Sequence, residues 1–151
     1  MFAAPMTSLT PLLLQANRFA RVCIEEAIRH ARVRKTFGKR LADHQALRHK
    51  LAEMAARVES THAMLEQIAF QMCNKVPDND IAGNIALIKY QATRNMEFCA
   101  REASQIFGGS AYVRGGKGAV VERLYREVRV MAIGGGSEEI MLDLAMRQAK
   151  L

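Results

Sequence analysis

Apolar residues recur at helical spacing through three long stretches of this 151-residue sequence, and no other feature constrains the fold as tightly. The stretches cover about residues 11–33, 45–74 and 81–106. The last of them keeps close to an ideal 3.6-residue period. The two-residue alternation typical of a β-strand is not found. The sequence therefore predicts a protein built from three long helices, with shorter apolar patterns near residues 120–131 and 140–145.

Helix-breaking residues separate these patterns. Val76-Pro77-Asp78 divides the second stretch from the third, and Gly108-Gly109 ends the third. Gly134-Gly135-Gly136 precedes Ser137, a natural N-cap residue for a last helix. Because short connections make consecutive helices antiparallel, we expect an up-down four-helix bundle with a short fifth C-terminal helix. We expect a single domain over residues 1–151, with residues 1–10 as an irregular lead.

Composition excludes several classes of function. The formal net charge is +7, but the basic residues are spread along the chain and interleaved with acidic ones, so we expect no nucleic-acid partner. An anionic small ligand or a negatively charged partner surface explains the sign equally well. No apolar run approaches the roughly 20 residues of a membrane span. The three cysteines lack the spacing of metal ligands, so we expect no metal site and interpret them as small buried residues.

A basic segment, Arg34-Lys35-Thr36-Phe37-Gly38-Lys39, follows the first helical stretch, and His44-Gln45 opens the second. A guanidinium group can hold a diphosphate with two parallel hydrogen bonds, which a lysine does poorly. Phe37 either packs back on the bundle or covers a flat ring, and Gly38 permits a tight turn. Taken alone, the segment favours a solvated basic loop with one aromatic side chain tucked in.

Two glycine-containing segments lie at other helix ends. Gln105-Ile106-Phe107-Gly108-Gly109 closes the third helix, and alone it indicates little more than a helix stop. Ile133-Gly134-Gly135-Gly136-Ser137-Glu138-Glu139 precedes the last helix. Successive backbone amides at a helix N-terminus favour an anion or a carbonyl group.

Together, these segments resemble the C-terminal helical domain of the acyl-CoA dehydrogenases, which are FAD enzymes. The resemblance runs from about Arg18 to Gln148, and Ala111 departs from it by replacing a usual glycine. It implies a flavoprotein oxidoreductase domain that takes part in fatty acid metabolism, where the complete enzyme removes the α and β hydrogens of an acyl-CoA thioester. It also implies a homo-oligomer, a dimer or tetramer, because in this family the basic segment reaches a neighbouring subunit's flavin.

The resemblance assigns a cofactor role to residues of all three segments. Arg34 and Thr36 would contact the FAD phosphates, and Gln105 with the following glycines would contact the adenosine half. The residues expected near FAD are Arg34, Thr36, Phe37, His44, Gln45, Gln105, Ile106, Gly108, Gly109, Ser137 and Glu139.

No catalytic residue is predicted. Many members of the family carry the glutamate that abstracts the substrate α-proton at the position occupied here by Gly135. Others carry it at the start of the first helix, where this chain has Ser8-Leu9. Because loss of a general base typically costs roughly 10²- to 10⁴-fold in rate, we expect this chain to be inactive alone.

The two ends of the sequence add two expectations. The family's amino-terminal helical domain and middle β-domain have no counterpart here, so a separate chain that carries them is a candidate partner. A fragment, a split-enzyme component and a truncated paralogue remain open. The terminal Ala149-Lys150-Leu151 is a conservative variant of the peroxisomal address, so we expect a peroxisomal location in a eukaryote and a cytoplasmic one otherwise. The alternative function is a non-catalytic helical scaffold for oligomerisation or partner binding, derived from the same family.

Overall fold

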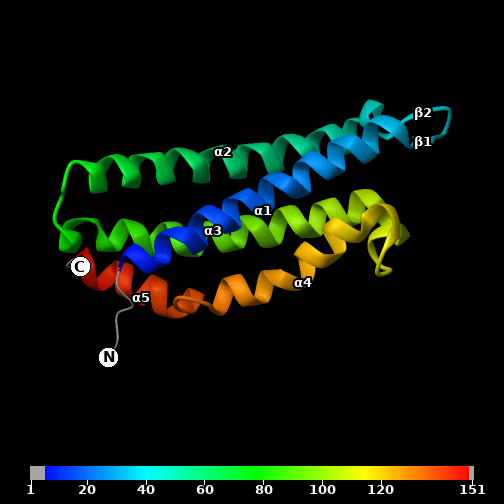
Figure 1. Cartoon of the computed structure of the whole chain (residues 1–151). Coiled ribbons are helices and arrows are strands. Elements are labelled where there is room, and N and C mark those ends of the chain that lie inside the picture. Colours follow the sequence, from blue (N-terminus) through cyan, green and yellow to red (C-terminus); the bar gives the residue numbers. More distant parts are fainter. Residues whose placement is uncertain (1–5, 150–151) are drawn as a thin grey trace.

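A computed structural model describes residues 6–149 and shows a helical bundle (Figure 1). The three long helices alternate in direction, and the two shorter ones follow one another along the fourth position of the bundle. This arrangement confirms the predicted all-α, up-down four-helix bundle with a short fifth C-terminal helix. The helices are α1 (Met6–Val33), α2 (Gln45–Cys73), α3 (Asp78–Phe107), α4 (Ala119–Ile133) and α5 (Glu138–Gln148).

Helix α3 is the centre of the bundle, because each of the other four helices packs against it. Its neighbour α1 presents a row of small side chains that are wholly removed from solvent. Small residues at a helix contact let two backbones approach closely. Both helices run in the same direction, so their C-terminal ends lie side by side at one end of the molecule (Figure 1). The small residues of α1 are Ala16, Ala20, Cys23, Ala27 and Ala31.

Two sequence predictions need correction. Residues 6–10 are helical rather than irregular, since α1 begins at Met6 and contains Pro11. Proline costs a helix one backbone hydrogen bond and is tolerated near its start, where the buried face of α1 outweighs the loss. The segment after α1 is also more than a loop: β1 (Lys35–Thr36) and β2 (Lys39–Arg40) form a two-stranded antiparallel hairpin. Strands of two residues are too short to show periodicity.

The cysteine interpretation holds for two of three residues. Cys23 and Cys99 are buried, and burial raises the pKa of each thiol to about 12, so they behave as apolar side chains. Cys73 is exposed at the end of α2, contrary to expectation. Among residues 6–149, no helix is long and apolar enough to cross a membrane, and no cluster of three acidic, His or Cys side chains is arranged to hold a metal ion.

Residues 1–5 and 150–151 lie outside the described part of the chain. The predicted peroxisomal address therefore lies largely outside it, because two of its three residues are Lys150 and Leu151. The address stays a prediction.

A fully buried lysine fixes the end of α4. The Nζ atom of Lys89 in α3 donates hydrogen bonds to the carbonyl oxygens of Met131, at 3.1 Å, and Ala132, at 2.8 Å. The last carbonyls of a helix lack partners within the helix, so this ammonium group caps α4. Burial lowers the pKa of Lys89, and the nearby Glu138 carboxylate opposes that shift. Lys89 thereby ties the glycine turn after α4 to the central helix.

We expect Lys89→Met to lower the free energy of unfolding by about 1–3 kcal/mol, because it leaves two buried carbonyl groups without donors. Urea denaturation followed by circular dichroism measures the change. The matched control is Arg48→Met on the exposed surface of α2, which we expect to stay within about 0.5 kcal/mol of the parent. Equal stability of the two variants would show that Lys89 does not hold α4.

Candidate cofactor site

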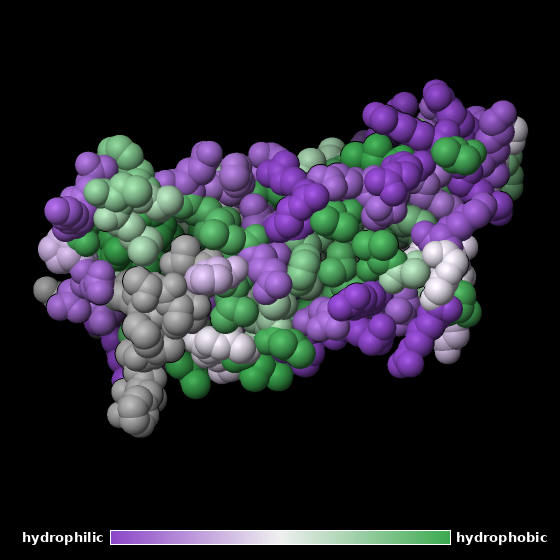
Figure 2. Space-filling model, viewed as in Figure 1, coloured by the Kyte–Doolittle hydropathy of each residue, from purple (hydrophilic) through white to green (hydrophobic). Residues whose placement is uncertain are grey.

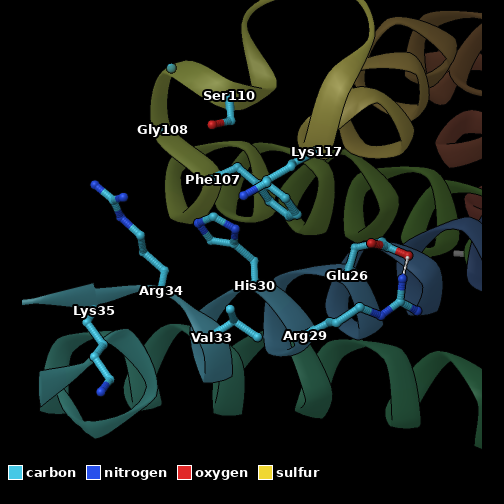
Figure 3. Close-up of a pocket in the computed structure, with 11 residues that line it drawn as sticks. Glu26, Arg29, His30, Val33, Arg34, Lys35, Phe107, Gly108, Ser110 and Lys117 are labelled. Carbon is cyan, nitrogen blue, oxygen red and sulfur yellow. Dashed lines mark hydrogen bonds and ion pairs between the residues drawn. The ribbon is translucent and has the colours of Figure 1, made fainter.

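The ends of α1 and α3 enclose a groove of about 1100 Å³ (Figure 3). One wall is formed by the last turns of α1 and the start of β1. The opposite wall is formed by the end of α3, the short turn η2 (Gly108–Ala111) and the turn η3 (Gly116–Gly118). The basic segment and the double-glycine segment, separated by about seventy residues in sequence, therefore meet within a single chain. The lining residues used below are Glu26, Arg29, His30, Val33, Arg34, Lys35, Phe107, Gly108, Gly109, Ser110 and Lys117.

The groove is positively charged. Arg34, Lys35 and Lys117 line it, and in the described part of the chain its one carboxylate, Glu26, is paired with Arg29 at 2.8 Å. Figure 2 shows that hydrophilic side chains gather at this end of the molecule. Such a groove attracts an anion, and its arginine suits a phosphate group in particular.

His30 is a lining residue that sequence reasoning missed. Its ring stacks on that of Phe107, with centroids 4.3 Å apart and an angle of 25° between the planes. Burial lowers the pKa of His30, and the Arg34 and Lys117 charges lower it further. The sequence held one signal for it: His30 lies four residues before Arg34 and therefore on the same face of α1.

Four of the predicted cofactor residues lie in the hairpin or between it and the start of α2, and three of them cluster outside the groove. Thr36 Oγ1 lies 3.2 Å from His44 Nε2, and the ring of His44 meets Phe37 edge-on at 6.4 Å. The fourth, Gln45, is exposed at the start of α2. Phe37 and Gly38 both have positive φ, 51° and 78°, as in the two-residue turn of a tight hairpin. A bulky residue seldom adopts this conformation, and Phe37 is 97% exposed.

The predicted residues of the double-glycine segment divide between groove and core. Gly108 and Gly109 line the groove, and no heavy atom lies within 4 Å of a Cβ built on either one. Gln105 is exposed on α3 but is not a lining residue. Ile106 is buried in the core, so its side chain does not reach the groove.

The predicted residues of the third segment lie at the turn between α4 and α5, far along the bundle from the groove (Figure 1). Ser137 occupies the N-cap position of α5. The pKa of Glu139 is lowered because its own backbone N–H and the Ser137 hydroxyl stabilise the carboxylate. Gly135 has φ 74°, a conformation that favours glycine, and it offers no side chain for proton transfer.

Comparison with known proteins identifies the family of this chain. A family model described as "Acyl-CoA dehydrogenase, C-terminal domain" matches residues 10–150. The chain belongs to the acyl-CoA dehydrogenase family. It is 44% identical over 136 residues to the acyl-CoA dehydrogenase AFT10-1 of Alternaria alternata, covering 87% of this chain and 32% of that protein. It is 35% identical over 135 residues to the acyl-CoA dehydrogenase apdG of Emericella nidulans, covering 87% and 31%.

Solved structures of acyl-CoA dehydrogenases share the fold. The enzyme from Geobacillus kaustophilus superposes with a TM-score of 0.89 at 25% identity, covering 97% of this chain and 37% of that one. The chain thus spans about a third of the length of the curated acyl-CoA dehydrogenases that it matches.

One glycine controls the shape of the groove's far wall. A Cβ at Gly118 would lie 2.3 Å from the carbonyl oxygen of Ser110, and that contact is with backbone. We expect Gly118→Ala to lower the free energy of unfolding by about 1–3 kcal/mol, because η3 must move away from η2. Gly109→Ala is the matched control, because a Cβ at this position has no heavy atom within 4 Å. We expect it to change the free energy of unfolding by no more than about 0.5 kcal/mol. Urea denaturation compares the two variants, and equal losses would contradict the proposed close approach.

Proposed function

We propose that the groove holds the adenosine diphosphate half of FAD, and that this chain is the FAD-contacting helical part of an acyl-CoA dehydrogenase. The observation that supports the proposal is the meeting of Arg34 with Gly108 and Gly109 across one groove. The phosphates would lie against Arg34 and Lys117, and the side chains of Val33 and Phe107 offer apolar surface to the adenosine. This lining fits a dinucleotide, because it combines cations that form no ion pair within residues 6–149 with two glycines and an aromatic ring.

The hairpin supports a contact beyond the groove. Thr36, Phe37 and His44 lie at the same end of the bundle, and Phe37 is almost wholly exposed, with the edge of His44 beside its ring. We propose that the cofactor held here extends towards a neighbouring subunit, so that Phe37 is covered only in the oligomer.

In the complete enzyme, bound FAD would accept the β-hydride of an acyl-CoA thioester while a carboxylate takes the α-proton. At the position where many members of the family carry the glutamate, this chain has Gly135, which has no side chain to accept a proton. The other position considered is Ser8 in the early part of α1. We therefore propose that the proton acceptor and the remainder of the flavin pocket come from another polypeptide segment, and that this chain alone does not turn over acyl-CoA.

The scaffold alternative rests on a separate observation. Helices α4 and α5 expose a set of large apolar side chains, which suits association with another protein surface. A homo-oligomer formed through this surface is compatible with both functions, so it does not discriminate between them. Binding of FAD distinguishes the two functions, because only the flavin function requires it. The exposed side chains are Val130, Ile133, Ile140 and Met146.

Titration of flavin fluorescence tests the cofactor proposal. We expect Arg34→Gln to weaken FAD binding by roughly 10- to 100-fold, the equivalent of about 1.5–3 kcal/mol for a hydrogen bond to a charged group. Arg34→Lys keeps the charge but loses the paired hydrogen bonds, so we expect an intermediate affinity. Arg48→Gln removes a cation outside the groove and should leave affinity unchanged. If FAD does not bind at high micromolar concentration, the scaffold function replaces the flavin one.

Sedimentation of the purified chain tests the apolar surface. We expect Val130→Glu to shift the oligomer towards monomer, because a charge would be buried in the contact. Phe70→Ser removes an equally exposed apolar side chain from α2 and should leave the assembly intact. Dissociation by both variants, or by neither, would contradict the assignment of the contact to α4 and α5.

A further inference from the structure

His30 lines the groove together with the cations that would hold a phosphate group. It lies on α1 between the guanidinium of Arg34 and the ammonium of Lys117, with one face of its ring against Phe107 (Figure 3). The backbone N–H of Arg34 donates to the carbonyl of His30 at 2.9 Å, so the two residues are held one helical turn apart. Stacking fixes the plane of the ring and leaves its edge towards the groove.

Charged side chains lie on both walls of the groove around His30. On α1 the ion pair of Glu26 and Arg29 is internally neutralised. Arg34, Lys35 and Lys117 remain as unpaired cations in the described groove, while α3 contributes only the uncharged ring of Phe107. Without a ligand, the partial burial of the ring and then the Arg34 and Lys117 charges disfavour the imidazolium form, which explains the lowered pKa of His30.

We propose that His30 is a proton-accepting ligand of the phosphate group, so that the groove takes up one proton from solvent when a diphosphate binds. The inference rests on the proposed function. It adds a ligand residue, His30, and a coupling between proton uptake and ligand binding, neither of which the proposed function requires. A diphosphate esterified at both ends brings two negative charges into the cation cluster and offsets the repulsion that Arg34 and Lys117 exert on His30. The imidazolium form is then favoured, and its second N–H becomes a donor to the phosphate oxygens.

Proton linkage has a measurable consequence. Where free His30 is neutral and bound His30 is charged, affinity falls with rising pH by up to about tenfold per pH unit. Below the pKa of the free ring the dependence disappears, because His30 is charged in both states. The same linkage predicts that the ligand raises the pKa of His30 from its lowered value.

Calorimetry of FAD binding to the 151-residue chain tests the proposal. The diphosphate of FAD is esterified at both ends, so the ligand itself does not titrate over about pH 5–8, the range in which histidine changes charge. Titrations in two buffers of different ionisation enthalpy count the protons taken up. We expect uptake by the parent chain, and none by His30→Gln, whose affinity should be lower at acid pH and nearly independent of pH. His49→Gln on the exposed surface of α2 should behave as the parent.

The outcomes separate the two proposals. Binding of FAD without proton uptake, or unchanged uptake in His30→Gln, overturns the role of His30 and leaves the flavin site standing. Absence of FAD binding overturns both. His30→Phe keeps an aromatic ring on Phe107, so it replaces His30→Gln if that variant is unfolded. In the parent chain, an NMR titration of the His30 ring must show a higher pKa with FAD than without it, and an unchanged pKa overturns the proposal.

Discussion

The close contact between α1 and α3 is the constraint on which the rest of the structure depends. Small side chains on α1 are wholly buried, and α3 packs against every other helix. Because the two helices run in the same direction, their C-terminal ends are brought together (Figure 1). That meeting places His30 and Arg34 opposite Phe107. Larger residues in place of the small buried side chains of α1 would separate the two helices and widen the groove between their ends.

This geometry sets an unusual electrostatic problem for a phosphate site. Many such sites use a helix N-terminus, where backbone N–H groups and the positive end of the dipole attract the anion. Here two helices present their negative ends. Attraction must therefore come from side chains, and Arg34, Lys35 and Lys117 supply it. Side-chain cations at an open groove are screened by salt, so binding at this site should depend on ionic strength more than binding in an amide nest does.

Periodicity and glycine positions were sufficient to predict the helices and the breaks between them, because both report local structure directly. The connection between the two distant segments came from the resemblance to a known family. The sequence could not place His30, since a histidine on a helix is uninformative until the facing residue, Phe107, is known. The resemblance also placed Ile106 near the cofactor together with the other residues of its segment, whereas the Ile106 side chain is buried in the core. The positive φ of Phe37 was missed for a different reason. Gly38 indicates a turn, but it does not indicate that the residue before it also has a positive φ.

Phe37 combines two unfavourable features, a strained backbone and an almost wholly hydrated ring. Asparagine or glycine would relieve both at once. Stability of the isolated bundle therefore gives no reason for a phenylalanine at this position. A surface that covered the ring would remove it from water, so position 37 would add to stability only in an assembled form.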